Sequence, residues 1–339
     1  MRIQLVTQMW PSPENPDLGS FLVPLVAEFR RRGHETEVSA ISRRGGAPTK
    51  YARLVGRSVA DARRGRPDVV FAHFLFPAGA AGVAASLAGR CPLVVMAHGT
   101  DVANLTEIRG VRMATAPVVS RSAAVISNSR WLADRLTASI PAAAPKISIA
   151  DCGIDLDAFR PADAGPARER LGWGGDGPAF LCVGSLIERK NVIGLADAFA
   201  SLGRGRLAFV GDGPLRSQLE GRPGVRVVGR IPQRDVPEWV TACDVLCQPS
   251  LIEPFGQAAL EGMAMERSVI ATKNGGPPEF IPPEAGVLVD PADPEELRAA
   301  LEAAAAMPAP NRAAREAARR HDVRTEAAKM LDVLAAACQ

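Results

Sequence analysis

Short apolar runs alternate along the chain with longer stretches in which apolar residues recur every three or four positions. In the first half the apolar runs cover residues 3–6, 37–40, 69–72, 93–97, 124–127 and 147–150. Continuous apolar runs of this length are typical of parallel strands that are buried on both faces. The amphipathic stretches between them include 20–32, 78–89 and 130–139 and predict helices, the first of which ends at Gly33. The pattern predicts an α/β fold with a doubly wound parallel sheet.

The second half repeats the pattern after a Pro- and Gly-rich stretch, residues 161–178, which we interpret as a linker between domains. Further strands are expected at 179–183, 207–210, 225–228, 245–247, 269–271 and 286–289, and alanine-rich helices at 299–306 and 313–337. We therefore expect one domain over 1–160 and a second over 161–320. A C-terminal helix over 321–339 follows, and its return to the first domain is one option. Two such domains imply a deep cleft that the carboxyl ends of the strands face.

Composition excludes several classes of function. The net charge of +3 over 339 residues, without an arginine-rich tail, argues against nucleic acid as a partner. The six cysteines have no framework spacing, and Cys243 and Cys247 lack a second ligand pair, so we expect free thiols and no metal. No apolar window is long enough for a membrane span, and the N-terminus lacks the apolar segment of a signal peptide. These features together predict a cytoplasmic protein.

Unusual residues follow the predicted strands of the first half. Gly19 begins the helix after the first strand, but the G-x-G-x-x-G pattern of dinucleotide-binding proteins is absent there, which argues against an NAD enzyme. His73 ends one strand, and His98-Gly99-Thr100-Asp101 follows the next. A lone histidine is more often structural than catalytic, so His73 is left as structural, whereas His98 and Asp101 are candidate site residues.

The second half has glycines and cations at the corresponding positions. Gly184 follows the first strand, and Arg189-Lys190 lies on the same loop. An arginine can bind two oxygens of a diphosphate while a lysine adds a point charge, although a solvated surface pair is the simpler interpretation of these two residues alone. Gly211 is expected in a tight turn after the next strand, and Arg230-Ile231 could present backbone groups to a nucleobase.

The most informative segment is Glu253-Pro254-Phe255-Gly256-Gln257-Ala258-Ala259-Leu260-Glu261. It follows a predicted buried strand, and a helix is expected to begin near Gly256, with one carboxylate before the helix and the other on its second turn. Backbone N–H groups in the first turn of a helix have no partner within the helix and favour an anion. A phosphate at Gly256, Gln257 and Ala258, with hydroxyl groups held by Glu253 and Glu261, would suit a sugar nucleotide. Two surface glutamates near a loop are the alternative.

With these motifs in order, nearly the whole chain resembles the family-4 retaining glycosyltransferases of the GT-B fold. The E-x7-E element is the most specific of them. The motifs that carry the resemblance are Gly19-Ser20-Phe21, His98-Gly99-Thr100-Asp101, Gly153-Ile154-Asp155 with Phe159-Arg160-Pro161, Gly184-Ser185-Leu186 with Arg189-Lys190-Asn191, Val210-Gly211-Asp212-Gly213-Pro214, and Glu253 with Glu261.

The resemblance implies two Rossmann-like domains and metal-independent transfer of a hexose-type sugar from a nucleotide-diphosphate sugar, which is a substrate, so that no cofactor is expected. Arg189 and Lys190 would stabilise the departing diphosphate, and Glu253 and Glu261 would hold hydroxyls of the sugar and the ribose. Further donor contacts are implied at Gly19, Gly184, Gly211, Arg230, Ile231, Phe255, Gly256, Gln257 and Ala258, and His98 and Asp101 would contact the sugar at its reacting face. The acceptor, bound by the N-terminal domain, is a glycan, a lipid or a small metabolite.

Two alternatives remain on this evidence. The same architecture serves sugar-nucleotide epimerases and phosphorylases, of which the latter would normally need a much longer chain. It would also suit a binding protein without turnover. Arg267 stands where the family usually has glycine, which keeps that second alternative open and puts the local turn in doubt.

The arginine-rich stretch 30–66 raises the question of a membrane. A basic face could dock on anionic lipid at the inner side of a membrane, and a solvated surface in an arginine-biased protein is the equal alternative. The oligomeric state, the donor base and the donor sugar are left open.

Overall fold

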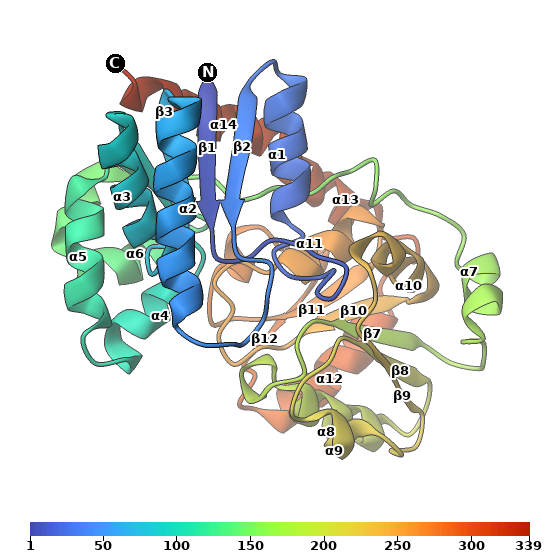
Figure 1. Ribbon diagram of the computed structural model, residues 1–339. Helices are drawn as coiled ribbons and strands as arrows, with labels where there is room; N and C mark the ends of the chain where they lie inside the picture. The colour runs from blue at the N-terminus through green and yellow to red at the C-terminus, as the bar shows by residue number, and fades with distance from the viewer. The chain divides into compact units, whose positions relative to one another are not determined.

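The computed structural model describes residues 1–339 and divides into two compact units (Figure 1). Unit 1 comprises Met1–Gly153 and Val323–Gln339, and unit 2 comprises Ile154–Asp322. The chain thus passes into unit 2 several residues before the expected position 160. The last segment of the chain belongs to unit 1, the option left open for the C-terminal helix.

Unit 1 is built on a six-stranded parallel sheet in the order β2-β1-β3-β4-β5-β6. Its strands are β1 (Arg2–Thr7), β2 (Glu35–Ala40), β3 (Val69–His73), β4 (Leu93–Ala97), β5 (Ala124–Ser127) and β6 (Ile147–Ile149). The middle strands β3 and β4 are buried along their whole length, as their continuous apolar sequences predict. The order reverses between β1 and β3, which is the mark of a doubly wound sheet.

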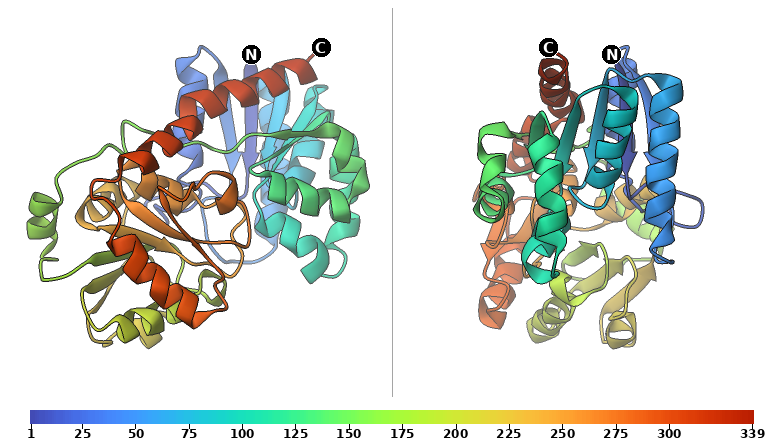
Figure 2. Two further views of the ribbon diagram at one scale, coloured as in Figure 1. Left: turned by 180° about the vertical axis from the view of Figure 1, so that it is seen from behind. Right: turned by 60° about the vertical axis from the view of Figure 1, so that its left-hand side comes forward.

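Helices cover both faces of this sheet (Figure 2). Alternate residues of β3 enter two different cores: Phe71 packs with Phe29 and Met330, and Ala72 packs with Leu54 and Ala81. The first core lies under α1 and α14, and the second under α2, α3 and α5. The helices of unit 1 are α1 (Leu22–Arg31), α2 (Thr49–Gly65), α3 (Ala78–Gly89), α4 (Thr100–Glu107), α5 (Val111–Arg121), α6 (Arg130–Ser139) and α14 (Val323–Ala337), with the 3-10 helix η1 (Pro141–Lys146).

Unit 2 has the same class of architecture. Its parallel sheet has the order β12-β11-β10-β7-β8-β9. The strands are β7 (Ala179–Val183), β8 (Arg206–Val210), β9 (Val225–Gly229), β10 (Val245–Gln248), β11 (Ser268–Thr272) and β12 (Gly286–Val289). The two parallel sheets confirm the predicted α/β class.

The helices of unit 2 again form two layers. α8 and α12 share one core with Phe180 and Phe209, and α10, α11 and α13 share the other with Leu181 and Leu246. The helices are α7 (Ala164–Leu171), α8 (Val192–Leu202), α9 (Arg216–Leu219), α10 (Val236–Ala242), α11 (Gln257–Ala264), α12 (Pro294–Ala305) and α13 (Arg312–Ala318). The 3-10 helices are η2 (Glu188–Lys190), η3 (Gln233–Asp235), η4 (Pro277–Glu279) and η5 (Arg319–His321).

Two features differ from the expectation. Residues 161–178, expected as a linker, contain α7, which packs on α10 inside unit 2. The single helix expected over 313–337 is α13 and α14, because the chain leaves unit 2 between them, at Asp322–Val323. No helix of the structure has the length and the apolar character needed to span a membrane.

Candidate functional site

The candidate residues of unit 2 lie at the carboxyl end of its sheet. The strand order reverses between β7 and β10, since β8 and β9 follow on one side of β7 while β10 lies on the other. Ligands of open α/β sheets bind outside the carboxyl ends of the strands at such a point. Arg189 and Lys190 follow β7, and Glu253 to Glu261 follow β10.

Close backbone contacts hold the loops at these strand ends. Gly184 donates its N–H to Val210, and Gly211 donates to Gly229, both at 2.9 Å. Gly211 has a φ of 144°, and a Cβ there would lie 1.8 Å from the carbonyl oxygen of Gly184, so that only glycine fits. Gly184 and Gly211 therefore have a structural role in bringing the loops after β7, β8 and β9 together, whatever they contact in a ligand.

Glu253 lies at the centre of a buried polar network. One carboxylate oxygen, Oε2, accepts hydrogen bonds from Lys190 Nζ at 2.5 Å, Gln248 Nε2 at 2.9 Å and Ser250 Oγ at 3.0 Å. Only 9% of the Glu253 side chain and 17% of the Lys190 side chain are exposed, so this is a largely buried ion pair. The other oxygen, Oε1, takes no part in these bonds.

The protonation of Glu253 reflects this network. Burial by itself raises its pKa. The charge and hydrogen bond of Lys190, with the charge of Arg189 and the hydroxyl of Ser250, act in the opposite direction and bring the pKa below its ordinary value. The carboxylate is therefore ionised at neutral pH.

The helix expected after Glu253 begins where the sequence predicts, at Gln257, with Gly256 as its cap at a φ of 116°. The side chain of Gln248 reaches into its first turn, where Oε1 accepts the N–H of Ala259 at 3.0 Å. The N–H groups of Gly256 and Ala258 have no partner. Two of the three predicted donor amides are thus available to an anion, and they lie in the chain between the two glutamates.

Glu261 is 6% exposed and has a different environment from Glu253. No cation pairs with it, and its hydrogen bond from Gln233 Nε2 at 3.1 Å only partly offsets its burial. Burial raises the pKa of Glu261 to about 8, so that the carboxyl group holds a proton at neutral pH. The two glutamates of the E-x7-E element therefore carry different charges at neutral pH.

The other candidates of unit 2 are less enclosed. Arg189 is half-buried, and its guanidinium donates to the carbonyl of Ile252 at 3.1 Å. Arg230 is exposed and Ile231 half-buried, directly after β9. The Phe255 ring packs between Phe280 and His321, at centroid distances of 5.1 and 5.9 Å. Phe255 therefore acts as an anchor for the loop before α11.

Three polar residues of this region were not singled out from the sequence: Gln248, Ser250 and Gln233. Gln248 is 5% exposed and is the last residue of β10, so a polar side chain at the end of an otherwise apolar strand was the available signal. Ser250 and Gln233 lie on loops, and nothing in the sequence pattern distinguishes them from other loop residues.

In unit 1, Asp101 is a buried structural carboxylate. It accepts four backbone N–H groups, from Leu75 and Gly99 at 2.8 Å and from His98 and Val102 at 3.1 Å. Burial raises its pKa, and these hydrogen bonds partly offset that effect. These hydrogen bonds shape the loop after β4 and include one from the backbone of His98, while the expected contact of Asp101 with a sugar stays a prediction.

His98 lies against His73 at the ends of β4 and β3, with His98 Nε2 3.0 Å from His73 Nδ1. Burial lowers the pKa of His98 to about 3 and that of His73 well below its ordinary value, so both rings are neutral. Gly19 has a φ of 68°, and a Cβ there would lie 2.5 Å from the carbonyl oxygen of Met9. Close packing against Met9 and the positive φ are therefore sufficient to explain why position 19 is a glycine.

The structure explains the unusual Arg267. Its guanidinium is buried and donates to the carbonyls of Val240, Thr241 and Ala162 at 3.2, 2.9 and 3.1 Å. Glu266, with a φ of 58°, takes the left-handed conformation at this turn. Arg267 precedes β11 and so lies at the amino end of the sheet, opposite to the loops that carry Lys190 and Glu253.

The family described as "Glycosyltransferase Family 4" matches residues 18–158, and that described as "Glycosyl transferases group 1" matches residues 177–306. A D-inositol 3-phosphate glycosyltransferase of Xylanimonas cellulosilytica is 31% identical over 312 residues, which make up 83% of this chain and 75% of the relative. The chain belongs to the family-4, group 1 glycosyltransferases.

Other members of the family are covered less completely. A teichuronic acid biosynthesis glycosyltransferase of Bacillus subtilis, TuaC, which is described as putative, is 29% identical over 244 residues. The match covers 69% of this chain but 60% of that relative, less than two thirds of its length.

Solved structures agree with the fold. HepE of Anabaena in complex with UDP-glucose superposes with a TM-score of 0.80 at 21% identity, over 99% of this chain and 100% of that one. Sucrose-phosphate synthase of Thermosynechococcus elongatus gives 0.79 at 20% identity, over 98% of both chains. The predicted GT-B class is thereby confirmed.

Proposed function

We propose that the protein transfers a hexose-type sugar from a nucleotide-diphosphate sugar to an acceptor hydroxyl, without a metal ion and with retention of configuration. The observation that carries the proposal is the start of α11, where the unpartnered N–H groups of Gly256 and Ala258 lie in the chain between the carboxylate of Glu253 and the carboxyl group of Glu261. Because HepE is described in complex with UDP-glucose, a UDP-sugar is the first donor to test.

In this proposal the donor diphosphate lies between the amides of α11 and the cations after β7. Arg189 binds the diphosphate through its guanidinium. Lys190 keeps one hydrogen bond to Glu253 and donates another to the phosphate oxygens. As the bond between the anomeric carbon and the diphosphate breaks, negative charge grows on the leaving group. Fixed amides and cations at that position lower the barrier because they need no reorganisation.

The same step forms the new glycosidic bond. The acceptor hydroxyl attacks the anomeric carbon from the face that the diphosphate leaves, and its proton passes to a diphosphate oxygen. Glu253 uses its available Oε1 to hold a sugar hydroxyl and is not assigned as a nucleophile. Glu261 holds the ribose hydroxyls, Arg230 and Ile231 flank the base, and His98 faces the sugar.

The acceptor is left as a class, a hydroxyl of a glycan, a lipid or a small metabolite. The names of the relatives do not agree on one acceptor, since they include both D-inositol 3-phosphate glycosyltransferases and TuaC, which is named for teichuronic acid biosynthesis. A screen of acceptors therefore belongs after the donor is known.

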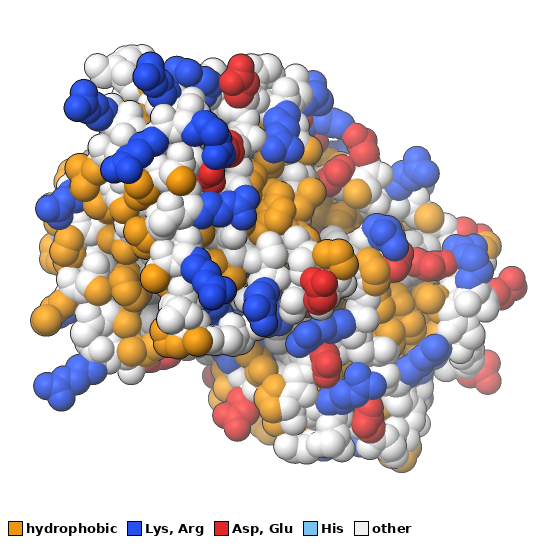
Figure 3. Space-filling view, viewed as in Figure 1, with side chains coloured by type: hydrophobic (Ala, Val, Ile, Leu, Met, Phe, Trp, Pro, Cys, Tyr) orange, Lys and Arg blue, Asp and Glu red, His pale blue; other side chains and the backbone are white.

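Contact with an anionic membrane stays a proposal of lower priority. Figure 3 shows Lys and Arg side chains spread over the visible face of unit 1 around α2, with Asp and Glu among them. Several arginines of the stretch 30–66 are neutralised by ion pairs: Arg31 and Arg32 with Glu28, Arg44 with Asp17, and Arg57 and Arg64 with Asp61. Binding to anionic vesicles that is insensitive to salt would contradict electrostatic docking.

The experiment that tests the function is a donor panel followed by mass spectrometry. The protein is incubated with UDP-, GDP-, ADP- and dTDP-sugars in chelator-treated buffer, and slow release of nucleotide is recorded. Release from one donor should fall about 100- to 1000-fold in Arg189→Ala, the usual loss for one stabilising group, and should be unchanged in Arg298→Ala on the surface of α12.

Other results would favour the alternatives. A change of the sugar without release of nucleotide would indicate an epimerase, and binding of donor without any product, even with acceptors present, would indicate a binding protein. Once an acceptor is known, the anomeric configuration of the product, measured by NMR, tests retention.

A further inference from the structure

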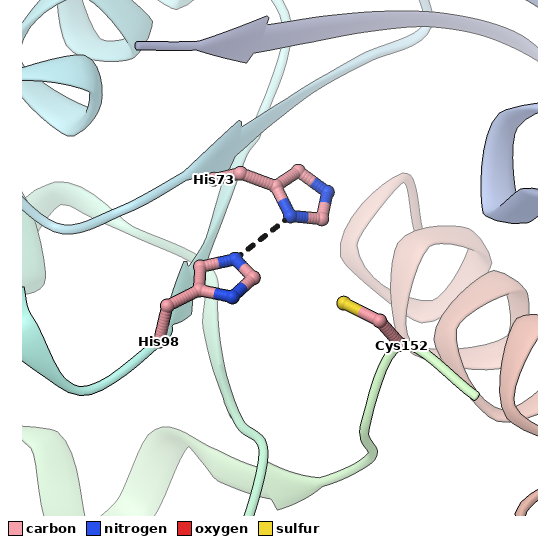
Figure 4. A group of neighbouring side chains, drawn as sticks. All are labelled: His73, His98 and Cys152. Carbon is pink, nitrogen blue, oxygen red and sulfur yellow. Dashed lines mark hydrogen bonds between the residues drawn. The ribbon is translucent and has the colours of Figure 1, made fainter. Parts of the chain in front are cut away.

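Unit 1 contains a cluster of metal-ligating side chains that the proposed transfer reaction does not need. His73 ends β3, His98 follows β4 and Cys152 follows β6, so the three come from neighbouring strand ends of one sheet. One nitrogen of each ring and the sulfur of Cys152 all lie within 4.8 Å of one another. Figure 4 shows the two rings on one side and the Cys152 sulfur approaching them from the loop after β6.

The hydrogen bonding within the cluster is incomplete. His73 is fully buried and bonds to His98 through Nδ1, whereas its Nε2 is buried without any partner. Nε2 lacks a hydrogen-bond partner in either tautomer of His73, because a proton on Nε2 would have no acceptor and a lone pair on Nε2 would have no donor. A buried polar atom without a partner costs about 1–3 kcal/mol, so the hydrogen bonds of the protein alone do not satisfy this pair of rings.

The surroundings would favour a bound ion that is shielded from water. Phe71 lies 4.3 Å from the His73 ring centroid and Phe74 lies 4.4 Å from that of His98. Cys152 is 5% exposed and packs in the core under α14. Two imidazoles and a thiolate form a soft donor set with a single negative charge, and such a set selects cations that bind sulfur strongly.

We propose that His73, His98 and Cys152 bind a thiophilic d10 cation, Zn²⁺ or Cu⁺. A tetrahedral zinc ion with bonds of about 2.0–2.1 Å to nitrogen and about 2.3 Å to sulfur holds its ligand atoms roughly 3.5 Å apart. From the 4.8 Å limit of the cluster, the ligand atoms would have to approach one another by at most about 1.3 Å, which is within the reach of small side-chain rotations. Water can occupy the remaining position of Zn²⁺, and Cu⁺ is satisfied by three ligands.

Binding of such an ion would have a consequence for activity, and this part rests on the proposed function. The ion would hold the His98 ring that we place at the sugar, and transfer would be inhibited. A metal ion at His73, His98 and Cys152 would therefore inhibit the enzyme. It would take no part in the metal-independent transfer at Arg189 and Lys190.

The test is a metal titration of the whole, reduced protein, in competition with a chromophoric chelator, performed separately for Zn²⁺ and Cu⁺. Co²⁺ serves as a spectroscopic probe because a thiolate ligand gives it an intense charge-transfer band. Cys152→Ser and His73→Gln remove proposed ligands, while Cys338→Ser and His34→Gln remove another cysteine and another histidine of unit 1. Thermal melting of each variant checks that it is folded.

The wild type should bind one equivalent of Zn²⁺ or Cu⁺, with the charge-transfer band for Co²⁺. Removing a direct ligand should weaken binding by more than the roughly 10- to 100-fold of an outer-shell change, and the control variants should bind like the wild type. Binding that is equal in wild type and folded Cys152→Ser, or no binding of either ion, would overturn the proposal. Because the titration uses no sugar, failure of the proposed function would leave this result unaffected.

Discussion

The Lys190–Glu253 pair allows a sharp test of the electrostatics in unit 2. In Lys190→Ala the carboxylate keeps its hydrogen bonds from Gln248 and Ser250 but loses its counter-charge. At the 2.5 Å separation and an effective dielectric constant of about 20, the lost attraction is about 7 kcal/mol before desolvation is considered. Part of this attraction only offsets the cost of burying both charges, and breaking buried pairs typically lowers stability by about 3–5 kcal/mol.

The two single substitutions should differ. With Glu253 side-chain exposure of 9% and Lys190 exposure of 17%, the carboxylate has the poorer access to water once its partner is gone. We therefore expect Lys190→Ala to lower the free energy of unfolding by about 3–5 kcal/mol and Glu253→Gln by less. The double variant should cost less than the sum of the two, because neither charge is then left alone.

The stability difference between the wild type and Lys190→Ala should depend on pH in a definite direction. The pKa of Glu253 is lowered in the folded protein, so its contribution to stability is present above its unfolded value of 4.5 and is lost as the pH falls through the folded value. Lys190→Ala removes the main cause of the lowering and leaves burial, which raises the pKa. The deficit of Lys190→Ala should thus be largest near neutral pH and should shrink as the pH falls below about 5.

Chemical denaturation at several pH values measures these differences. Tryptophan fluorescence reports on unit 2 in a background with Trp10→Phe and Trp131→Phe, because the remaining Trp173 and Trp239 are both buried in unit 2 with ring centroids 5.4 Å apart. Lys273→Ala is the matched control, since Lys273 pairs with Glu296 at the surface, where a pair contributes about 0–1 kcal/mol. A Lys190→Ala variant as stable as Lys273→Ala, or one with a deficit that does not change with pH, would refute this account of the pair.

Further predictions concern neighbouring residues. The pKa of Glu261 is raised to about 8 in the folded protein, so its contribution to stability is present below its unfolded value of 4.5 and is lost as the pH rises through 8. The melting temperature of the wild type should therefore fall relative to that of Glu261→Gln between pH 4.5 and pH 8. Melting temperatures that change in parallel with pH would contradict this. Gln248→Ala leaves the N–H of Ala259 without a partner and should cost about 1–3 kcal/mol in denaturant unfolding, with Gln218→Ala, at an exposed position, as the control. Arg267→Ala should lower the free energy of unfolding by about 2–4 kcal/mol, because three hydrogen bonds are lost. Its affinity for the donor, measured by calorimetry, should stay unchanged. A selective loss of donor affinity would show that the turn before β11 matters to the site.

The strands were the most predictable part of the fold. β4, β5, β7 and β12 begin and end where their apolar runs do, because strands buried on both faces leave an uninterrupted apolar signal. The ends of the units were less predictable, because composition marks a flexible stretch but does not record tertiary contacts. The stretch 161–178 is rich in Pro and Gly and still contains a helix that packs on α10.

Within the site, the sequence located the residues but did not determine their partners. Lys190 and Glu253 are 63 positions apart, and only the neighbouring positions of β7 and β10 bring them together. Asp101 could not be distinguished from a catalytic acid by its motif, because its four bonds to backbone N–H groups depend on the path of the loops after β3 and β4. Likewise, nothing in the spacing of His73, His98 and Cys152 along the chain indicates that they meet.

The place of α14 in unit 1 has a consequence for how the protein is made. Its Met330 and Leu334 fill the core beneath α1, yet they are among the last residues of this sequence to be synthesised. Unit 2 is one continuous segment that leaves the ribosome before α14, and until α14 follows, unit 1 lacks a wall of its core. The unit whose translation begins first is therefore completed after unit 2, and a chain that ends at Asp322 would expose the apolar surface of unit 1 to chaperones.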